Sequence, residues 1–129
     1  MNDKTKPHFE RYQHLKSFAS RYEKQLAADL DWHCVILFYS ALHLLDCYLS
    51  TKSNIGFVVD SHPLRNKAIG KCPELNAMRG SYRSLQDLSE QVRYDPGYVY
   101  RSQDHTNCLK AFNKTVDVLE PKAKRNIGI

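Results

Sequence analysis

The first third of the chain carries apolar residues at helical spacing. They recur every three or four positions and comprise Phe9, Tyr12, Leu15, Phe18, Ala19, Tyr22 and Leu26. This repeat places them on one face of a helix. The sequence therefore predicts an amphipathic helix over residues of about 8 to 28, and its polar side carries Arg11, His14, Arg21 and Lys24.

The next stretch, DWHCVILFYSALHLLDCYLS, is apolar around almost its whole circumference. It predicts a second helix that Asp29 or Asp31 caps and that runs to about Ser50. A helix of this kind belongs in the centre of a bundle or at a subunit interface. Its exceptions are Tyr39, His43, Asp46 and Ser50, which align along one edge. The apolar run from Trp32 to Leu49 is a poor membrane span, because polar residues interrupt it at His33, Ser40, His43 and Asp46.

Turn-forming residues divide the rest of the chain. Residues 51–61 predict a loop from which Phe57, Val58 and Val59 fold back onto the core. His62 and Pro63 then begin a short helix that Gly70 ends. Pro73 opens a longer helix, and its core-facing positions are Leu75, Met78, Tyr82, Leu85, Leu88 and Val92.

The segment YDPGY at 94–98 predicts a turn before the last helix. That helix starts near Ser102 or Asp104 and ends before Pro121, with a buried stripe of Leu109, Phe112, Val116 and Leu119. A frayed basic tail follows from about residue 121. We therefore expect one all-α domain over residues 1–129, an up-and-down bundle of four long helices plus one short helix.

The amino-acid composition indicates where this bundle is located and what kind of partner it binds. The chain has 129 residues, enough to bury a core without disulfides. Its four cysteines show no C-x-x-C spacing, and the N-terminal residues lack an apolar leader, so we expect buried thiols in a cytoplasmic protein. The net charge of +5 favours an anionic partner such as RNA, DNA or a nucleotide.

The segment DSHPLRNK at 60–67 contains the first candidate site. His62 and Arg65 lie three residues apart at a helix N-terminus, where free N–H groups favour a phosphate. Arginine can grip two phosphate oxygens and histidine can exchange a proton near neutral pH. The structural alternative is that Asp60 or Ser61 caps the helix, the ring of His62 packs over Pro63 and Arg65 pairs with a surface carboxylate.

Two further histidines are candidates. His43 lies in the otherwise buried second helix, and Tyr39, Asp46 or Arg93 could hold it either as a catalytic group or as a structural hydrogen-bond partner. Arg101 and His105 form a second set. The sequence has no metal-ligand cluster, Gly-rich phosphate loop or G-x-S-x-G turn, so we expect no metal and no cofactor.

Basic residues supply a candidate RNA surface. The helix that Pro73 opens carries three arginines, Arg79, Arg83 and Arg93. They could form one basic stripe with the polar side of the first helix, if the two faces are adjacent. Tyrosines nearby, including Tyr94, could stack bases, and Asn66 completes this candidate set. The alternative is a solvated face beside core tyrosines.

The stretches DWHCVILFYSALHLLDCYLS, SHPLRNKAI and YRSLQDLSEQVRY, in this order, resemble small bacterial and archaeal members of the HEPN (higher eukaryotes and prokaryotes nucleotide-binding) superfamily. The resemblance covers roughly residues 30 to 95. It implies a helical bundle, a homodimer with a cleft between subunits, and RNA or a nucleotide as ligand. Many members are metal-independent ribonucleases of toxin or defence systems, with four to six residues between a motif Arg and His; Arg101 and His105 have three between them.

Two functions follow as expectations. The first is a dimeric RNA- or nucleotide-binding protein, with ribonuclease chemistry in which a 2′-OH attacks the adjacent phosphate, His62, Arg65 and His43 act on it, and Arg93 binds it. The second is a non-catalytic module that dimerises or docks a partner encoded alongside, such as a nucleotidyltransferase-type protein. A site that gathers His43, His62, Arg65 and Arg93 favours the first, and scattered positions favour the second.

Overall fold

The computed structural model describes residues 4–25 and 30–129, and this part of the chain is helical with no strand. Its elements in order are α1 (Thr5–Gln25), α2 (Leu30–Leu49), α3 (His62–Gly70), the 3₁₀ turn η2 (Pro73–Leu75), α4 (Asn76–Tyr94) and α5 (Ser102–Ile127). The prediction of an all-α helical bundle with four long helices and one short one is confirmed.

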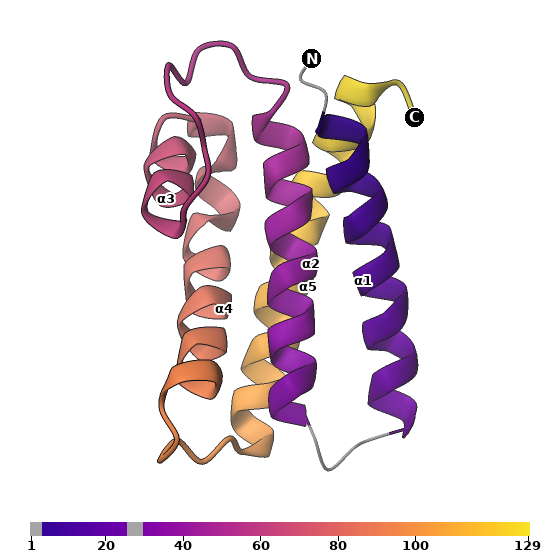
Figure 1. Cartoon of the computed structure of the whole chain (residues 1–129), viewed down its shortest axis with the longest axis vertical. Helices are drawn as coiled ribbons and strands as arrows, with labels where there is room; N and C mark the ends of the chain where they lie inside the picture. The colour runs from indigo at the N-terminus through magenta and orange to yellow at the C-terminus, as the bar shows by residue number, and fades with distance from the viewer. Residues whose placement is uncertain (1–3, 26–29) are drawn as a thin grey trace.

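The long helices stand side by side and alternate in direction (Figure 1). In this view α2 is in front, α1 and α4 lie on its two sides, and α5 lies behind. The short α3 rests beside the upper part of α4, below the loop that leaves α2. Thus α2 contacts α1, α4 and α5, and one edge of it faces the viewer.

The apolar character of α2 fits this central place. Fourteen of its residues are buried, among them Phe38, Leu44 and Leu45, which are fully enclosed. Within the described residues it is the one helix that is long and apolar enough to cross a membrane, and 78% of its most apolar window is buried in the bundle. A core helix gives the same signal through tertiary packing.

The helix boundaries differ from the predicted ones in three places. α1 begins at Thr5 rather than near residue 8, and the predicted end at 26–28 and the cap Asp29 lie outside the described residues. Asp31 lies in the first turn of α2 and accepts the Trp32 N–H through its carboxylate at 2.8 Å. Pro73 opens the turn η2, and α4 starts only at Asn76.

One apolar placement and the predicted end of α5 also need correction. Phe57 and Val59 pack against the core as expected, but Val58 is 76% exposed, because alternate side chains of this extended loop point to opposite sides. α5 continues six residues beyond Pro121 to Ile127, whereas a frayed tail was expected. Ala123 is fully buried there, so packing holds the helix together past the proline.

The start of α3 agrees with its capping chemistry. Ser61 is the N-cap, with extended backbone dihedrals, and its Oγ accepts the Leu64 N–H at 3.3 Å. Pro63 occupies the first turn, where its missing N–H costs nothing. The cap fixes the direction in which α3 leaves the loop, and this places Arg65 over α2.

Candidate functional site

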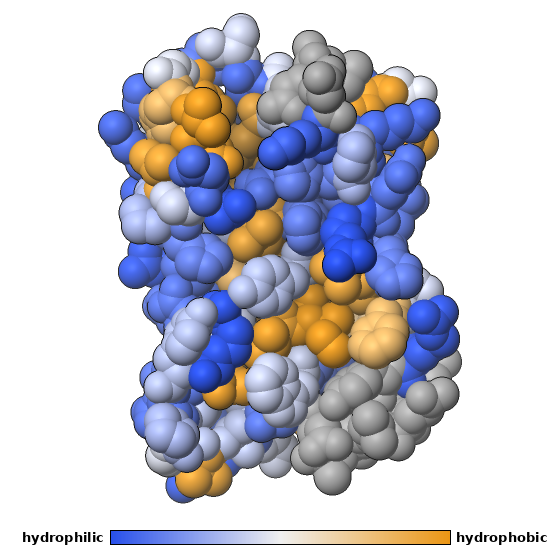
Figure 2. Space-filling view, viewed as in Figure 1, coloured by the Kyte–Doolittle hydropathy of each residue, from blue (hydrophilic) through white to orange (hydrophobic). Residues whose placement is uncertain are grey.

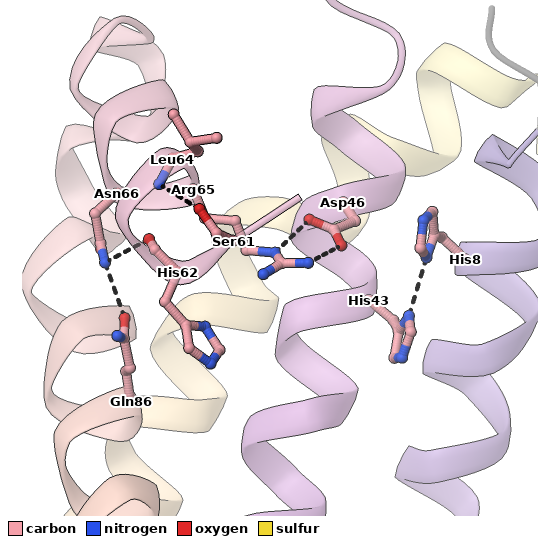
Figure 3. Close-up of polar contacts among 9 residues, drawn as sticks. All are labelled: His8, His43, Asp46, Ser61, His62, Leu64, Arg65, Asn66 and Gln86. Atoms are coloured by element: carbon pink, nitrogen blue, oxygen red, sulfur yellow. Dashed lines mark hydrogen bonds and ion pairs between the residues drawn. The ribbon is translucent and has the colours of Figure 1, made fainter. Parts of the chain in front are cut away.

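Arg65 forms a paired contact with Asp46 of α2. Its Nε and Nη2 atoms donate to the two carboxylate oxygens, each at 2.8 Å (Figure 3). The side chains are only 13% and 8% exposed. Two parallel hydrogen bonds between opposite charges are among the strongest polar contacts in proteins. Asp46 therefore already occupies the fork that could grip a phosphate, and this carboxylate is buried, whereas the structural alternative expected one on the surface.

His43 has a local partner that the sequence did not suggest. Its Nδ1 lies 2.9 Å from Nδ1 of His8 on α1, and the two rings face each other across the α1–α2 contact (Figure 3). Burial, and then the neighbouring His8, lowers the pKa of His43 to about 4. Burial also lowers the pKa of His8. Both rings are therefore neutral at pH 7, and the pair joins two helices.

His62 packs against the core. Its ring centroid lies 5.6 Å from that of Phe38, and its Nδ1 is buried without a hydrogen-bond partner among the described residues. Asn66, a candidate RNA-binding residue, donates through Nδ2 to the His62 carbonyl and to Gln86 Oε1, both at 3.0 Å. Burial, and then the positive charge of Arg65, lowers the pKa of His62.

Arg93 lies among aromatic rings. Its Nη1 donates to the Tyr39 hydroxyl at 2.6 Å and to the Tyr94 hydroxyl at 3.2 Å. The guanidinium stands 4.8 Å from the Tyr94 ring centroid and 5.8 Å from that of Phe38. Such stacking stabilises the cation and fixes its direction. Tyr94 itself is 72% exposed, so this cluster reaches the surface.

These four side chains do not line one hollow. In Figure 3, His62 and His43 lie on opposite sides of α2, with the Arg65–Asp46 pair between them. A hollow of about 950 Å³ lies between the starts of α1 and α3 and the 51–60 loop, and its walls include Arg65, Asp46, His8, Lys4 and Lys52. His43, His62 and Arg93 are not part of its lining.

The second candidate set, Arg101 and His105, does not come together in one site either. Arg101 is exposed at the start of α5, whereas His105 is buried. The Tyr100 hydroxyl lies 3.0 Å from His105 Nδ1, and His105 Nε2 lies 3.3 Å from His33 Nδ1. His33 Nε2 in turn donates to the Ala19 carbonyl at 2.9 Å, which makes His33 Nδ1 an acceptor while the ring is neutral. This chain of bonds ties α5 to α2 and α1.

The remaining basic candidates lie apart from one another. Arg79 and Arg83 are exposed on α4, and Arg83 pairs with Asp87 at 3.2 Å. Since α1 and α4 flank opposite sides of α2, the predicted continuous basic stripe does not form (Figure 1).

Among the described side chains, no three or more His, Cys, Asp or Glu residues form a cluster that could hold a metal ion. All four cysteines are buried thiols outside any disulfide, as predicted. Each is at most 1% exposed.

Comparison of the sequence with known proteins found no relative of this chain. No protein-family model matches the chain, and no curated protein matches it.

The contacts of His8 and His33 were not predicted from the sequence. Both lie at positions where helical spacing alone gives no sign of a polar contact, and their partners are 35 and 72 residues away.

Proposed function

We propose that this chain is a HEPN-like helical module that docks another protein chain and does not cleave RNA. The partner is a second copy or an effector protein encoded alongside. One observation carries this proposal. Trp32, Ile36, Tyr39 and His43, hereafter the α2 edge, remain partly or largely exposed on a helix that is otherwise buried from His33 onward. An exposed apolar edge on the central helix is typical of a protein contact.

The occupied side chains support the non-catalytic part of the proposal. Arg65 is bound by Asp46, His43 by His8, and Arg93 by Tyr39. A general base must reach its proton, and a phosphate-binding arginine must present its free fork. Arg65, His43 and Arg93 Nη1 would each have to break an internal contact first, and His62 Nδ1 and Arg93 Nη2 are buried among the described residues.

The test is incubation of purified protein with total RNA from pH 6 to 8, the range over which histidine changes charge. We expect the RNA to stay intact with the unmodified protein, with His62→Ala and with Arg65→Ala. His14→Ala, which changes an exposed histidine of α1, is the matched control. Cleavage that His62→Ala abolishes and His14→Ala retains would contradict the proposal.

A second candidate function is binding of RNA or a nucleotide without cleavage. The observation in its favour is the 950 Å³ hollow, whose lining combines Lys4, Lys52 and Arg65 with the apolar ring of Phe57. In the same RNA samples, retention of RNA by the protein that Lys4→Glu weakens and exposed Lys114→Glu leaves unchanged would favour this function.

A further inference from the structure

We infer that the α2 edge binds an amphipathic helix of a different protein, with the apolar row of that helix on Trp32 and Ile36 and one of its carboxylates on the Tyr39 and Tyr94 hydroxyls. This inference deepens the docking role proposed above and rests on it, because it names the chemistry of the partner. It is carried by the spacing of the edge, the hydrogen bonds of the two hydroxyls and the charges around them.

The spacing of the edge is that of a helix–helix contact. Its residues follow one another at intervals of four, three and four positions, so they form one row along α2. Trp32 is 52% exposed, and Ile36 and Tyr39 are partly exposed. Figure 2 shows apolar surface across the front of the molecule, where Figure 1 places α2, with hydrophilic side chains on both sides. An amphipathic helix recognises such a row with apolar residues at the same spacing.

Two tyrosine hydroxyls on this face still have a hydrogen to donate. The Tyr39 hydroxyl, from α2, accepts from Arg93 Nη1 at 2.6 Å, and the Tyr94 hydroxyl, from the end of α4, accepts from the same atom at 3.2 Å. A tyrosine hydroxyl has an O–H donor besides its acceptor lone pairs. Within the described residues neither hydroxyl donates a hydrogen bond. Both O–H groups can therefore donate to one acceptor from outside the chain.

Arg93 makes an anion the favoured acceptor. Its guanidinium lies 5.2 Å from the centroid of the Tyr39 ring and 4.8 Å from that of the Tyr94 ring. In the described part of the chain no carboxylate pairs with this cation, and Glu90, one turn earlier on α4, instead accepts from Gln86 Nε2 at 3.0 Å. Hydroxyls that accept from a cation are polarised and become stronger donors. Two such donors match the two oxygens of a carboxylate.

The surroundings of Tyr94 favour a single carboxylate over a nucleic acid. Asp87, Glu90 and Asp95 lie around the exposed Tyr94 ring. A nucleic-acid strand carries a negative charge on every nucleotide, so the phosphates next to a bound one would meet these acidic groups. A protein helix can place one carboxylate at the hydroxyls and neutral or basic residues on either side of it. The partner is therefore a helix with a single acidic position beside its apolar row.

A second copy of this chain does not supply that helix. The α2 edge contains no Asp or Glu, so the same edge of another copy offers no carboxylate to the hydroxyls. It would also bring a second Arg93 to the contact, and like charges oppose association. The net charge of +5 adds to this repulsion.

The first measurement uses a labelled synthetic peptide as the partner helix. It has the length of α2, 20 residues, with Leu at intervals of four and three positions and one Glu beside the centre of this row. A second peptide carries Gln in place of the Glu. We expect fluorescence anisotropy to show that the Glu peptide binds about tenfold more tightly, because hydrogen bonds to a charged group are the stronger ones.

Variants of the protein locate this preference. Tyr39→Phe and Tyr94→Phe keep the rings and remove the hydroxyls, so the double variant should bind the Glu peptide no more tightly than the Gln peptide. Tyr98→Phe, in the groove between α4 and α5, is the matched control and should keep the tenfold preference. Ile36→Glu should weaken binding of both peptides by about tenfold or more. Circular dichroism checks that every variant remains helical.

Equal affinity for the two peptides, or no binding of either, would overturn the inference. So would a preference for Glu that persists without the two hydroxyls. Displacement of the peptide by a single-stranded RNA oligonucleotide that also needs these hydroxyls would make the edge a phosphate site and overturn it as well.

A homodimer that excludes the peptide and that Ile36→Glu dissolves would likewise overturn the inference, but it would leave the docking role intact. Cleavage of RNA contradicts the non-catalytic proposal and leaves the peptide measurement untouched. Failure of this inference and failure of the proposed function can therefore be told apart.

Discussion

At the scale of single residues, the Asp46–Arg65 pair has the largest expected effect on stability. Both groups are charged and nearly buried, so each has lost most of its hydration. Removing one partner leaves the other charge buried and unpaired, which costs more than the pair contributes when intact. Arg65 therefore contributes to the stability of the fold as long as Asp46 is present.

Arg65→Ala should lower the free energy of unfolding by about 3 kcal/mol, because it leaves the Asp46 carboxylate buried without its cation. The double variant Asp46→Leu, Arg65→Leu should recover most of this loss, since no buried charge remains. Urea denaturation measures both. Arg83→Ala is the matched control: its pair with Asp87 is more than half exposed on both sides, and the expected loss is below about 1 kcal/mol. An Arg65→Ala variant as stable as the unmodified protein would disprove this account.

The His8–His43 pair makes stability depend on pH. In their 2.9 Å contact one ring must donate and the other accept, so the pair does not survive protonation of both rings. The surrounding charges are mixed: Lys4 and Arg11 from the α1 side and Arg65 from α3 disfavour a proton, while Asp46 on α2 favours it. Burial outweighs them and keeps both pKa values low.

The folded pKa of His43 is about 4, and that of an unfolded histidine is about 6.5. Protons therefore bind the unfolded chain first, and stability is lost as the pH falls from about 6.5 towards 4. Between pH 7 and pH 5, the free energy of unfolding should fall by about 1–2 kcal/mol more in the unmodified protein than in His43→Gln. Denaturation curves at both pH values measure this. His14→Gln, at an exposed site, should follow the unmodified protein, and an equal fall in all three would refute the assignment.

At the scale of elements, α5 is the helix whose local sequence and tertiary packing conflict. Pro121 lacks the N–H that would bond to the carbonyl four residues earlier, which usually ends or kinks a helix. Contacts beyond it oppose this effect: Ala123 is buried, and Asn126 donates to Thr51 Oγ1 at 2.8 Å. Gly128, at φ 79°, then closes the helix in the left-handed conformation.

Pro121→Ala should raise the free energy of unfolding by about 1–3 kcal/mol, because it restores a helical N–H and removes the clash of the ring. Thermal and urea denaturation provide the measurement. Lys110→Ala, at an exposed position of the same helix, should change stability by less than about 0.5 kcal/mol. If Pro121→Ala were less stable than the unmodified protein, a kink at residue 121 would be needed for the packing of the last turns.

At the scale of the whole molecule, periodicity predicted the helices well and their ends less well. The apolar positions of α4 are an example: Met78, Tyr82 and Leu85 are buried where the spacing placed them. Helix ends such as that of α5 depend on contacts with the remote Thr51, which a local pattern does not contain. The buried cysteines followed from their apolar surroundings.

The candidate site was harder to predict, because the role of each side chain depends on a partner from another part of the chain. Spacing correctly singled out Asp46 on the polar stripe of α2, and a carboxylate partner for Arg65 was one of two interpretations. The partner of His43 is 35 residues away on another helix, and nothing in the sequence near His8 indicates it. A polar residue in an apolar helix therefore predicted a polar contact but not its partner.

The position of α1 at the side of the bundle has a consequence for how the fold opens. α1 packs mainly on α2 and touches α5 only slightly, whereas α2, α4 and α5 all contact one another. The three-helix unit keeps its mutual contacts if α1 separates, but separation exposes Phe9 and Tyr12 of α1, so opening here costs the burial of these two side chains. Opening it breaks the His8–His43 contact and uncovers a second side of α2, so the area of α2 open to another chain grows without global unfolding.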